Sequence, residues 1–191
     1  NYFETLNVLV RAIEANDPYT SGHSMRVSAY SEAIATQLGL PQSKIDLIKS
    51  AALLHDIGKI GIDKSILNKR LEKEEFEQIK AHPEIGAGII ADLSNLSNIS
   101  DIIRHHHERN DGKGYPDGLS HDDIPLETSI LTIADSFDAM TTNRPYRSSL
   151  SLEAALKEIK DNAGTQFNPD IVDDAIIALQ KAFFELPEQK V

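Results

Sequence analysis

Apolar residues recur at intervals of three and four along most of the chain, and this spacing most restricts the fold. Such a period places apolar side chains on one face of an α-helix, whereas a half-buried strand needs strict alternation. Only residues 129–134 are ambiguous between helix and strand. The sequence therefore predicts an all-α bundle of roughly seven or more helices. The clearest stripes are Val27, Tyr30, Ile34 and Leu38; Ile45, Ile48, Ala52 and His55; and Val172, Ile176 and Leu179.

One long loop interrupts the helical pattern. Residues 108–127 carry three glycines and two prolines with little apolar periodicity. Loops of this length inside a compact domain tend to be functional. Further along, Asn168 before Pro169 is typical of a helix start. The 191 residues fit a single domain, 1–191, in which residues 1–15 are expected to form a linker helix from an upstream regulatory or sensor domain.

Composition excludes several classes of function. The chain has no cysteine, which excludes disulfides, thiolate catalysis and zinc–thiolate sites. Its formal net charge of -11 argues against a sequence-independent nucleic-acid binder, so no DNA or RNA partner is expected. No apolar run reaches the roughly 20 residues that span a bilayer, and no signal peptide opens the chain. We expect no membrane contact from this segment and a cytoplasmic location, alone or as part of a membrane-anchored protein.

Histidines and aspartates gather where predicted helices end or turn inward. His55 closes an apolar stripe and Asp56 follows it, a pair that is costly to bury without a cation. Lys59 lies one turn further on, so a buried ion pair between Asp56 and Lys59 is the alternative explanation. His82 precedes Pro83, which disfavours helix at position 82 and predicts a break where the imidazole projects into a cleft.

Two further groups follow the same logic. His106 and His107 extend an apolar helical face and could bind two metals, or one metal and a substrate, whereas His105 is expected to face solvent. Asp135 and Asp138 lie one turn apart in an apolar stretch. They are expected to share a buried face, unless they cap a helix or occupy a surface turn.

Four imidazoles and two carboxylates form the candidate ligand set: His55, Asp56, His82, His106, His107 and Asp135. Nitrogen and oxygen ligands without thiolate suit iron, manganese, zinc, nickel or cobalt better than calcium or magnesium. Because six ligands exceed the needs of one open metal site, we expect two divalent ions about 3.5–4 Å apart, bridged by Asp56. Such a pair would generate hydroxide from water and hold a phosphodiester for in-line attack.

The segments around these residues resemble the HD-GYP family. Residues 55–59 (HDIGK) resemble the HD motif of metal-dependent phosphohydrolases, and residues 106–116 (HHERNDGKGYP) resemble the extended GYP signature. The segments TSGHS at 20–24, HPEIG at 82–86, ADSFDAM at 134–140 and NRPYR at 143–147 follow in the family's order. The resemblance implies an HD-domain helical bundle with a long GYP loop. It also implies hydrolysis of cyclic di-GMP to linear pGpG, in some members onward to GMP.

Roles for individual residues come with the resemblance. It implies that the six candidate ligands bind metal, iron or manganese before zinc, nickel or cobalt. Asp56 and Lys59 are then catalytic, with Asp56 bridging the metals and Lys59 neutralising substrate charge. Residues implied to contact substrate are Lys59, Tyr115, Asp138, Arg144 and Arg147. In the family the GYP loop has been linked to GGDEF-type cyclase domains, which are therefore expected partners, and the amphipathic residues 3–13 leave a homodimer open.

One position departs from the family pattern. Some members bind a third metal with a Glu four residues before the His of the GHS segment, and here that position is Tyr19, a poor ligand. His23 would then be a spectator, a substrate contact or a weak ligand. We therefore expect two metals, and a reaction that stops mostly at pGpG.

Two other functions stay open at this point. One is a catalytically silent receptor for cyclic di-GMP, which the complete set of six ligands disfavours. The other is an HD phosphohydrolase for another nucleotide. The complete GYP segment disfavours a generic phosphohydrolase but leaves mixed cyclic dinucleotides open.

Overall fold

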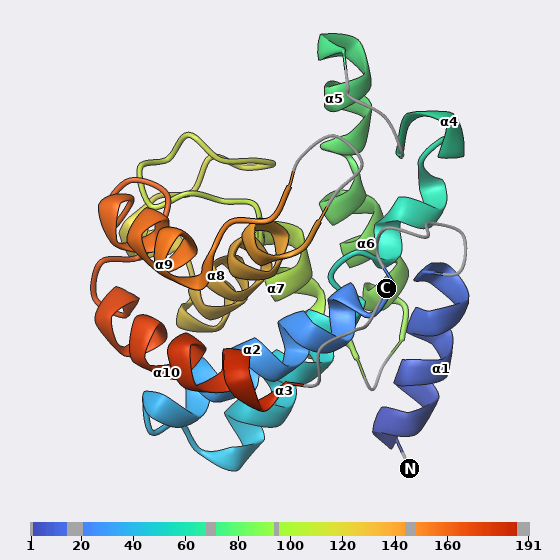
Figure 1. Ribbon diagram of the computed structural model, residues 1–191. Helices are drawn as coiled ribbons and strands as arrows, with labels where there is room; N and C mark the ends of the chain where they lie inside the picture. Colours follow the sequence, from blue (N-terminus) through green and yellow to red (C-terminus); the bar gives the residue numbers. More distant parts are fainter. Residues whose placement is uncertain (1, 15–20, 68–71, 94–95, 144–147, 187–191) are drawn as a thin grey trace.

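The computed structural model describes residues 2–14, 21–67, 72–93, 96–143 and 148–186. Within these ranges the chain forms ten α-helices and three short 3-10 helices, and two isolated β-bridges take the place of any sheet (Figure 1). The predicted all-α bundle is confirmed. The α-helices are α1 (Tyr2–Glu14), α2 (His23–Gln37), α3 (Gln42–Leu54), α4 (Lys64–Leu67), α5 (Lys73–Ile79), α6 (His82–Ala91), α7 (Ser100–His105), α8 (Leu126–Thr141), α9 (Leu152–Asp161) and α10 (Val172–Glu185). The 3-10 helices are η1 (Ile57–Gly61), η2 (Ser97–Ile99) and η3 (His121–Asp123).

Helix α8 lies at the centre of the bundle. It packs against α2, α3, α7 and α9, so its side chains are covered on several sides. Ile130, Leu131, Ile133 and Phe137 are fully buried. A helix covered all round needs no polar face, which explains why residues 129–134 lacked a clear period. The ambiguity is resolved in favour of helix because this segment is the core of the domain.

The other long helices close around α8. Helix α2 packs against α3 and α10, and the predicted stripe residues Val27 and Ile34 are buried completely. Helix α1 lies against α3, and its Leu6 and Val10 are buried. Helix α6 packs on η1 and α7, and α5 projects from the bundle just before α6 (Figure 1).

The last helix begins later than predicted. Asn168 accepts the backbone N–H of Asp170 at 2.9 Å, and α10 starts only at Val172. Asn168 and Pro169 therefore form a turn before the helix, because the Asn side chain caps this local turn instead of the helical N–H groups. Across the described ranges, no helix combines the length and the apolar character that a membrane crossing requires.

Candidate metal centre

All six predicted ligands come together beside the middle of α8. His55 directly follows α3, His82 is the first residue of α6, and His106 directly follows α7. Asp135 extends from the middle of α8. The predicted break lies between α5 and α6, but His82 itself is helical, because Pro is tolerated in the first turn of a helix. Asp56 and His107 complete the group, and His23 at the start of α2 joins it.

Asp56 sits between two groups of imidazoles. Its Oδ1 is 3.4 Å from His82 Nε2, and its Oδ2 is 3.7 Å from His55 Nε2. The candidate ligand atoms of His82, His106 and His107 lie within 4.8 Å of one another, and so do those of His55, Asp56 and His106. On the far side, His55 Nε2 is 3.8 Å from Asp135 Oδ1. The two groups share one cluster of donors, with the Asp56 carboxylate between them, and this arrangement would suit a pair of metal ions.

Three of the imidazoles are held in the same way. The Nδ1–H groups of His55, His82 and His106 each donate to the backbone carbonyl three residues earlier, at 2.7, 2.7 and 2.6 Å. Such a bond fixes the tautomer, so the lone pair of each Nε2 faces the cluster. The Nε2 of His55 is buried without a hydrogen-bond partner. A buried orphan of this kind is costly, and a divalent cation would satisfy it, so these residues fit a metal site.

The electrostatics keep the donors in their metal-binding forms. Burial, followed by the charge of His82, lowers the pKa of His107 to about 3. Burial and then His107 likewise hold the pKa of His106 well below its ordinary value. Burial opposes ionisation of Asp56, but Lys59 and then His55 outweigh it and hold its pKa well below the usual range. Neutral imidazoles beside ionised carboxylates are the forms that bind divalent metals.

Lys59 and Tyr115 border this cluster. Lys59 Nζ donates to Asp56 Oδ2 at 2.6 Å, so the ion pair considered as an alternative is present, at the edge of the ligand group. The ring of Tyr115 stacks on His107 with centroids 5.0 Å apart and planes inclined by 28°. Burial, then the charges of Asp135 and Asp56, raise the pKa of Tyr115, so the phenol stays neutral.

Asp138, which is predicted to contact substrate, is buried and bonded to protein side chains. Its carboxylate is 1% exposed, accepts His23 Nδ1–H at 2.7 Å and forms a forked ion pair with Arg26. Burial alone would lower the pKa of His23, yet bonds to Asp135 and Asp138 raise it to about 10. Asp138 therefore orients His23, and a direct contact between Asp138 and substrate stays a prediction.

The predicted long loop is tightly organised by its own hydrogen bonds. Buried Glu108 accepts the backbone N–H groups of Asp117 and Gly118 through Oε1 and that of Leu119 through Oε2. The backbone of Asp111 pairs with that of Ser120 across the loop. This organisation holds the GYP segment against the metal centre, because Tyr115 N–H also donates to the carbonyl of His107 at 3.2 Å.

The prediction for His105 was wrong. Its side chain is buried, and its two ring nitrogens face the carbonyl of Asp101 at 2.9 Å and the carboxylate of Asp117 at 2.8 Å. Arg104 also donates to Asp117 through two nitrogens. His105 faces inward because the loop folds back over α7 and covers that side of the helix, which helical periodicity alone could not indicate.

Sequence reasoning missed three residues that position the site. Glu108 organises the loop, Arg26 holds Asp138, and buried Glu14 accepts the backbone N–H groups of Gly22 and Ser24 on either side of His23. Only Glu108 carried a usable signal, since it lies inside the GYP signature. Three predicted positions, Tyr19, Arg144 and Arg147, lie outside the described residues.

Comparison with known proteins identifies the family to which the chain belongs. Residues 7–171 match the HD domain family. The chain belongs to the HD domain family. The match extends over most of the chain and includes every candidate ligand, and the predicted HD-GYP resemblance is confirmed by relatives of that kind.

Curated relatives of this HD domain act on cyclic dinucleotides. The present chain is 42% identical over 183 residues to a "Cyclic di-GMP phosphodiesterase" of Thermotoga maritima, and the match covers 94% of this chain and 50% of that protein. It is 38% identical over 181 residues to "3'3'-cGAMP-specific phosphodiesterase 3" of Vibrio cholerae, covering 94% of this chain and 38% of that protein. The chain thus spans half or less of the length of these relatives.

Solved structures agree on the fold. The HDG"Y"P protein Bd1817 of Bdellovibrio bacteriovorus superposes with a TM-score of 0.70 at 23% identity, covering 92% of this chain and 60% of that one. The HD domain of L. monocytogenes phosphodiesterase PgpH, in complex with cyclic-di-AMP, superposes with a TM-score of 0.66 at 19% identity. The superposition covers 96% of this chain and 98% of that one. At these identities the likeness establishes the HD fold of the chain.

Proposed function

We propose that this HD domain is a metal-dependent phosphodiesterase that hydrolyses cyclic di-GMP to pGpG. The observation that carries the proposal is the buried donor cluster in which Asp56 lies between His55 and His82. Relatives named as cyclic di-GMP phosphodiesterases support the substrate class. The silent-receptor alternative is disfavoured because all six donors are present and oriented toward one another.

Each residue has a role in this proposal. His55, Asp56, His82, His106, His107 and Asp135 would hold two divalent ions, iron or manganese before zinc, nickel or cobalt. When bound, such ions supply a water of lowered pKa and stabilise charge on a phosphodiester. Lys59 exchanges its bond to Asp56 for a phosphate oxygen and neutralises it. The Tyr115 ring provides an aromatic surface beside the reacting phosphate. Arg144 and Arg147 are proposed as further substrate contacts.

The direct test is a product assay on anaerobically purified protein loaded with Fe²⁺ or Mn²⁺. We expect linear pGpG as the main product from cyclic di-GMP, and no product from Asp56→Ala. Metal analysis should give two equivalents per chain. Three equivalents would contradict the assignment of His23 outside the ligand set, and turnover by Asp56→Ala would refute the bridging role of Asp56.

A second substrate is favoured by one specific finding. A relative at 38% identity is named for specificity toward 3',3'-cGAMP, a cyclic dinucleotide with one guanine and one adenine. Measuring kcat/KM for both nucleotides on the same preparation separates the candidates. A value at least about tenfold higher for cyclic di-GMP, worth about 1.4 kcal/mol, supports the leading proposal.

Assembly and location complete the proposal. We propose that a GGDEF-domain protein would bind at the GYP loop, predicted at residues 108–127 and followed by α8 from Leu126, and that the domain works in the cytoplasm. The homodimer, the single domain of residues 1–191 and the linker helix at 1–15 stay predictions. Sedimentation of the protein alone tests the homodimer. Sedimentation with a purified GGDEF domain tests binding of that partner.

A further inference from the structure

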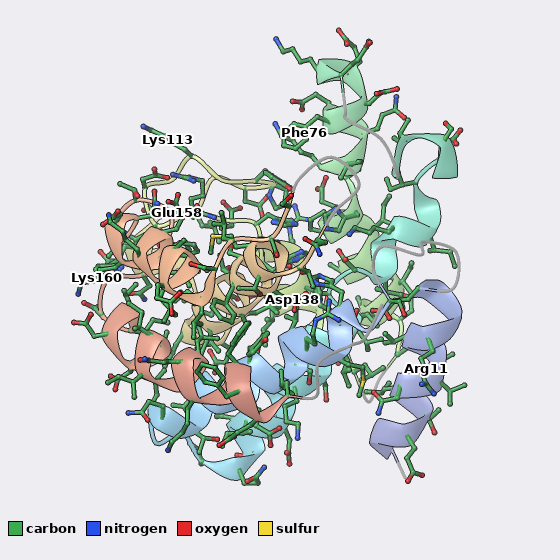
Figure 2. All side chains as sticks on the ribbon, in the orientation of Figure 1. Arg11, Phe76, Lys113, Asp138, Glu158 and Lys160 are labelled. Carbon is green, nitrogen blue, oxygen red and sulfur yellow. The ribbon has the colours of Figure 1, made fainter. Side chains whose placement is uncertain are left out.

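A cation and two aromatic rings meet at the rim of the metal centre. Lys80 Nζ lies 5.1 Å from the centroid of the Phe76 ring and 5.6 Å from that of Tyr115. Tyr115 in turn stacks on His107. The rim therefore continues from the candidate metal ligands through Tyr115 to α5, where Figure 2 labels Phe76.

Local structure fixes this arrangement. Phe76 and Lys80 are four residues apart, and Lys80 N–H donates to the carbonyl of Phe76 at 3.0 Å, so the two side chains share one face of the last turn. Two residues later, the ring of His82 is anchored on the carbonyl of Ile79 at 2.7 Å. The ammonium of Lys80 thus has a defined position relative to the metal centre.

Phe76 and Lys80 remain available to a ligand. Phe76 is 43% exposed, so part of its ring is open to solvent. Lys80 pairs with Glu77 at 2.8 Å, but the Glu77 side chain is 58% exposed. An exposed pair of this kind is weak and is readily exchanged for a better acceptor. Lys59 instead borders the candidate ligands beside Asp56, where the proposed function places a phosphate.

Base chemistry then distinguishes guanine from adenine at this rim. Aromatic rings stack on any nucleobase and do not discriminate between them. A lysine ammonium is a donor only, which suits the O6 and N7 acceptors of guanine. Adenine has a donor amino group in place of O6, so the same ammonium faces N7 alone and is repelled by the amino group.

We propose that Lys80 selects guanine, while the exposed ring of Phe76 forms the stacking platform for that base. The inference rests on the proposed function, because it assigns a base subsite to a cyclic dinucleotide whose phosphate is at the metal centre. It makes Lys80 a specificity-determining residue, distinct from the candidate metal ligands. Phosphate binding by Lys80 is the competing assignment, and the experiment separates the two.

The test compares variants on guanine and adenine dinucleotides. Metal-loaded wild type, Lys80→Met and Lys80→Arg are assayed for kcat/KM with cyclic di-GMP and for the inhibition constant of cyclic di-AMP against that reaction. Lys80→Met should lower kcat/KM for cyclic di-GMP by between about 5-fold and 100-fold while cyclic di-AMP inhibits unchanged. Lys80→Arg should keep the guanine preference, since arginine forks onto O6 and N7. Lys73→Met, an exposed lysine at the other end of α5, is the matched control.

A separate variant tests the platform. Phe76→Ala should weaken cyclic di-GMP and cyclic di-AMP together, each by about 5-fold or more, because stacking is insensitive to base identity. Equal weakening of both nucleotides by Lys80→Met would assign Lys80 to phosphate and overturn the guanine role, as would no change at all. Wild-type protein that cleaves no cyclic dinucleotide would instead refute the proposed function. The two failures are therefore distinguishable.

Discussion

Replacing Gly58 with alanine should pull Asp56 away from His82 and lower the metal content of the protein. A Cβ at position 58 would lie 1.9 Å from the carbonyl oxygen of His82 and 2.6 Å from the backbone nitrogen of Gly86. Both obstacles are backbone atoms, so no side chain can rotate away. Restoring an ordinary contact of 3.4 Å requires η1 and α6 to separate by about 1.5 Å.

That displacement acts directly on the ligand geometry. Asp56 immediately precedes η1 and His82 begins α6, and Asp56 Oδ1 is now 3.4 Å from His82 Nε2. A shift of this size moves the two donors out of reach of a shared ion. Misplacement by about 1 Å can cost 100-fold in rate, so we expect at least that loss in kcat/KM. Overpacking should also lower the free energy of unfolding by about 1–3 kcal/mol.

The assay pairs metal analysis with turnover and thermal melting. Gly88→Ala is the matched control, because Gly88 lies on the same helix α6 and a Cβ there meets nothing within 4 Å. It should keep full metal content and activity and gain about 0.5–1 kcal/mol of stability from the better helix former. If Gly58→Ala retained wild-type metal content and kcat/KM, the close packing of η1 on α6 would not be what positions Asp56.

Three further changes probe other parts of the centre. Asp56→Ala should lower bound metal below one equivalent per chain in elemental analysis, and two retained equivalents would contradict the bridging role. Gly114→Ala would place a Cβ 2.5 Å from the carbonyl oxygen of His107 and from two other backbone atoms. Tyr115 should therefore shift, and KM for cyclic di-GMP should rise about tenfold. An unchanged KM would exclude Tyr115 from substrate contact. Glu108→Gln should lower the unfolding free energy by about 1–3 kcal/mol in denaturant titration, because the amide NH₂ would replace one accepting oxygen and leave at least one backbone N–H without its acceptor. Unchanged stability there would mean that the loop does not depend on this anchor.

The helices and the ligand types could be predicted from the chain because both depend on local features. The stripe through Val27 and Ile34 needs only the helical period to be recognised, and it forms α2. The ligand set needs only residue types in an ordered series of motifs. Helix starts were less predictable, because Asn168 could cap either a helix or a turn and its neighbours decide which.

Contacts between distant segments could not be predicted in this way. The orientation of His105 depends on Asp117, and the orientation of His23 depends on Asp138, 115 residues further along the chain. Lys80 meets Tyr115 only because α5 and the loop approach the same rim. The spacing of residues within a single segment does not indicate which distant side chains it will contact.

By itself, the sequence determined that the chain is helical, that any metal must be bound by imidazole and carboxylate, and which six residues could do so. The tertiary structure decided which nitrogen of His55, His82 and His106 faces the cluster. It also decided that Asp56 stands between two groups of imidazoles and that Asp138 supports His23. The physical reason is that periodicity and residue chemistry act within one helical turn. Ligand geometry depends instead on how closely separate elements pack, as at the Gly58 contact with α6.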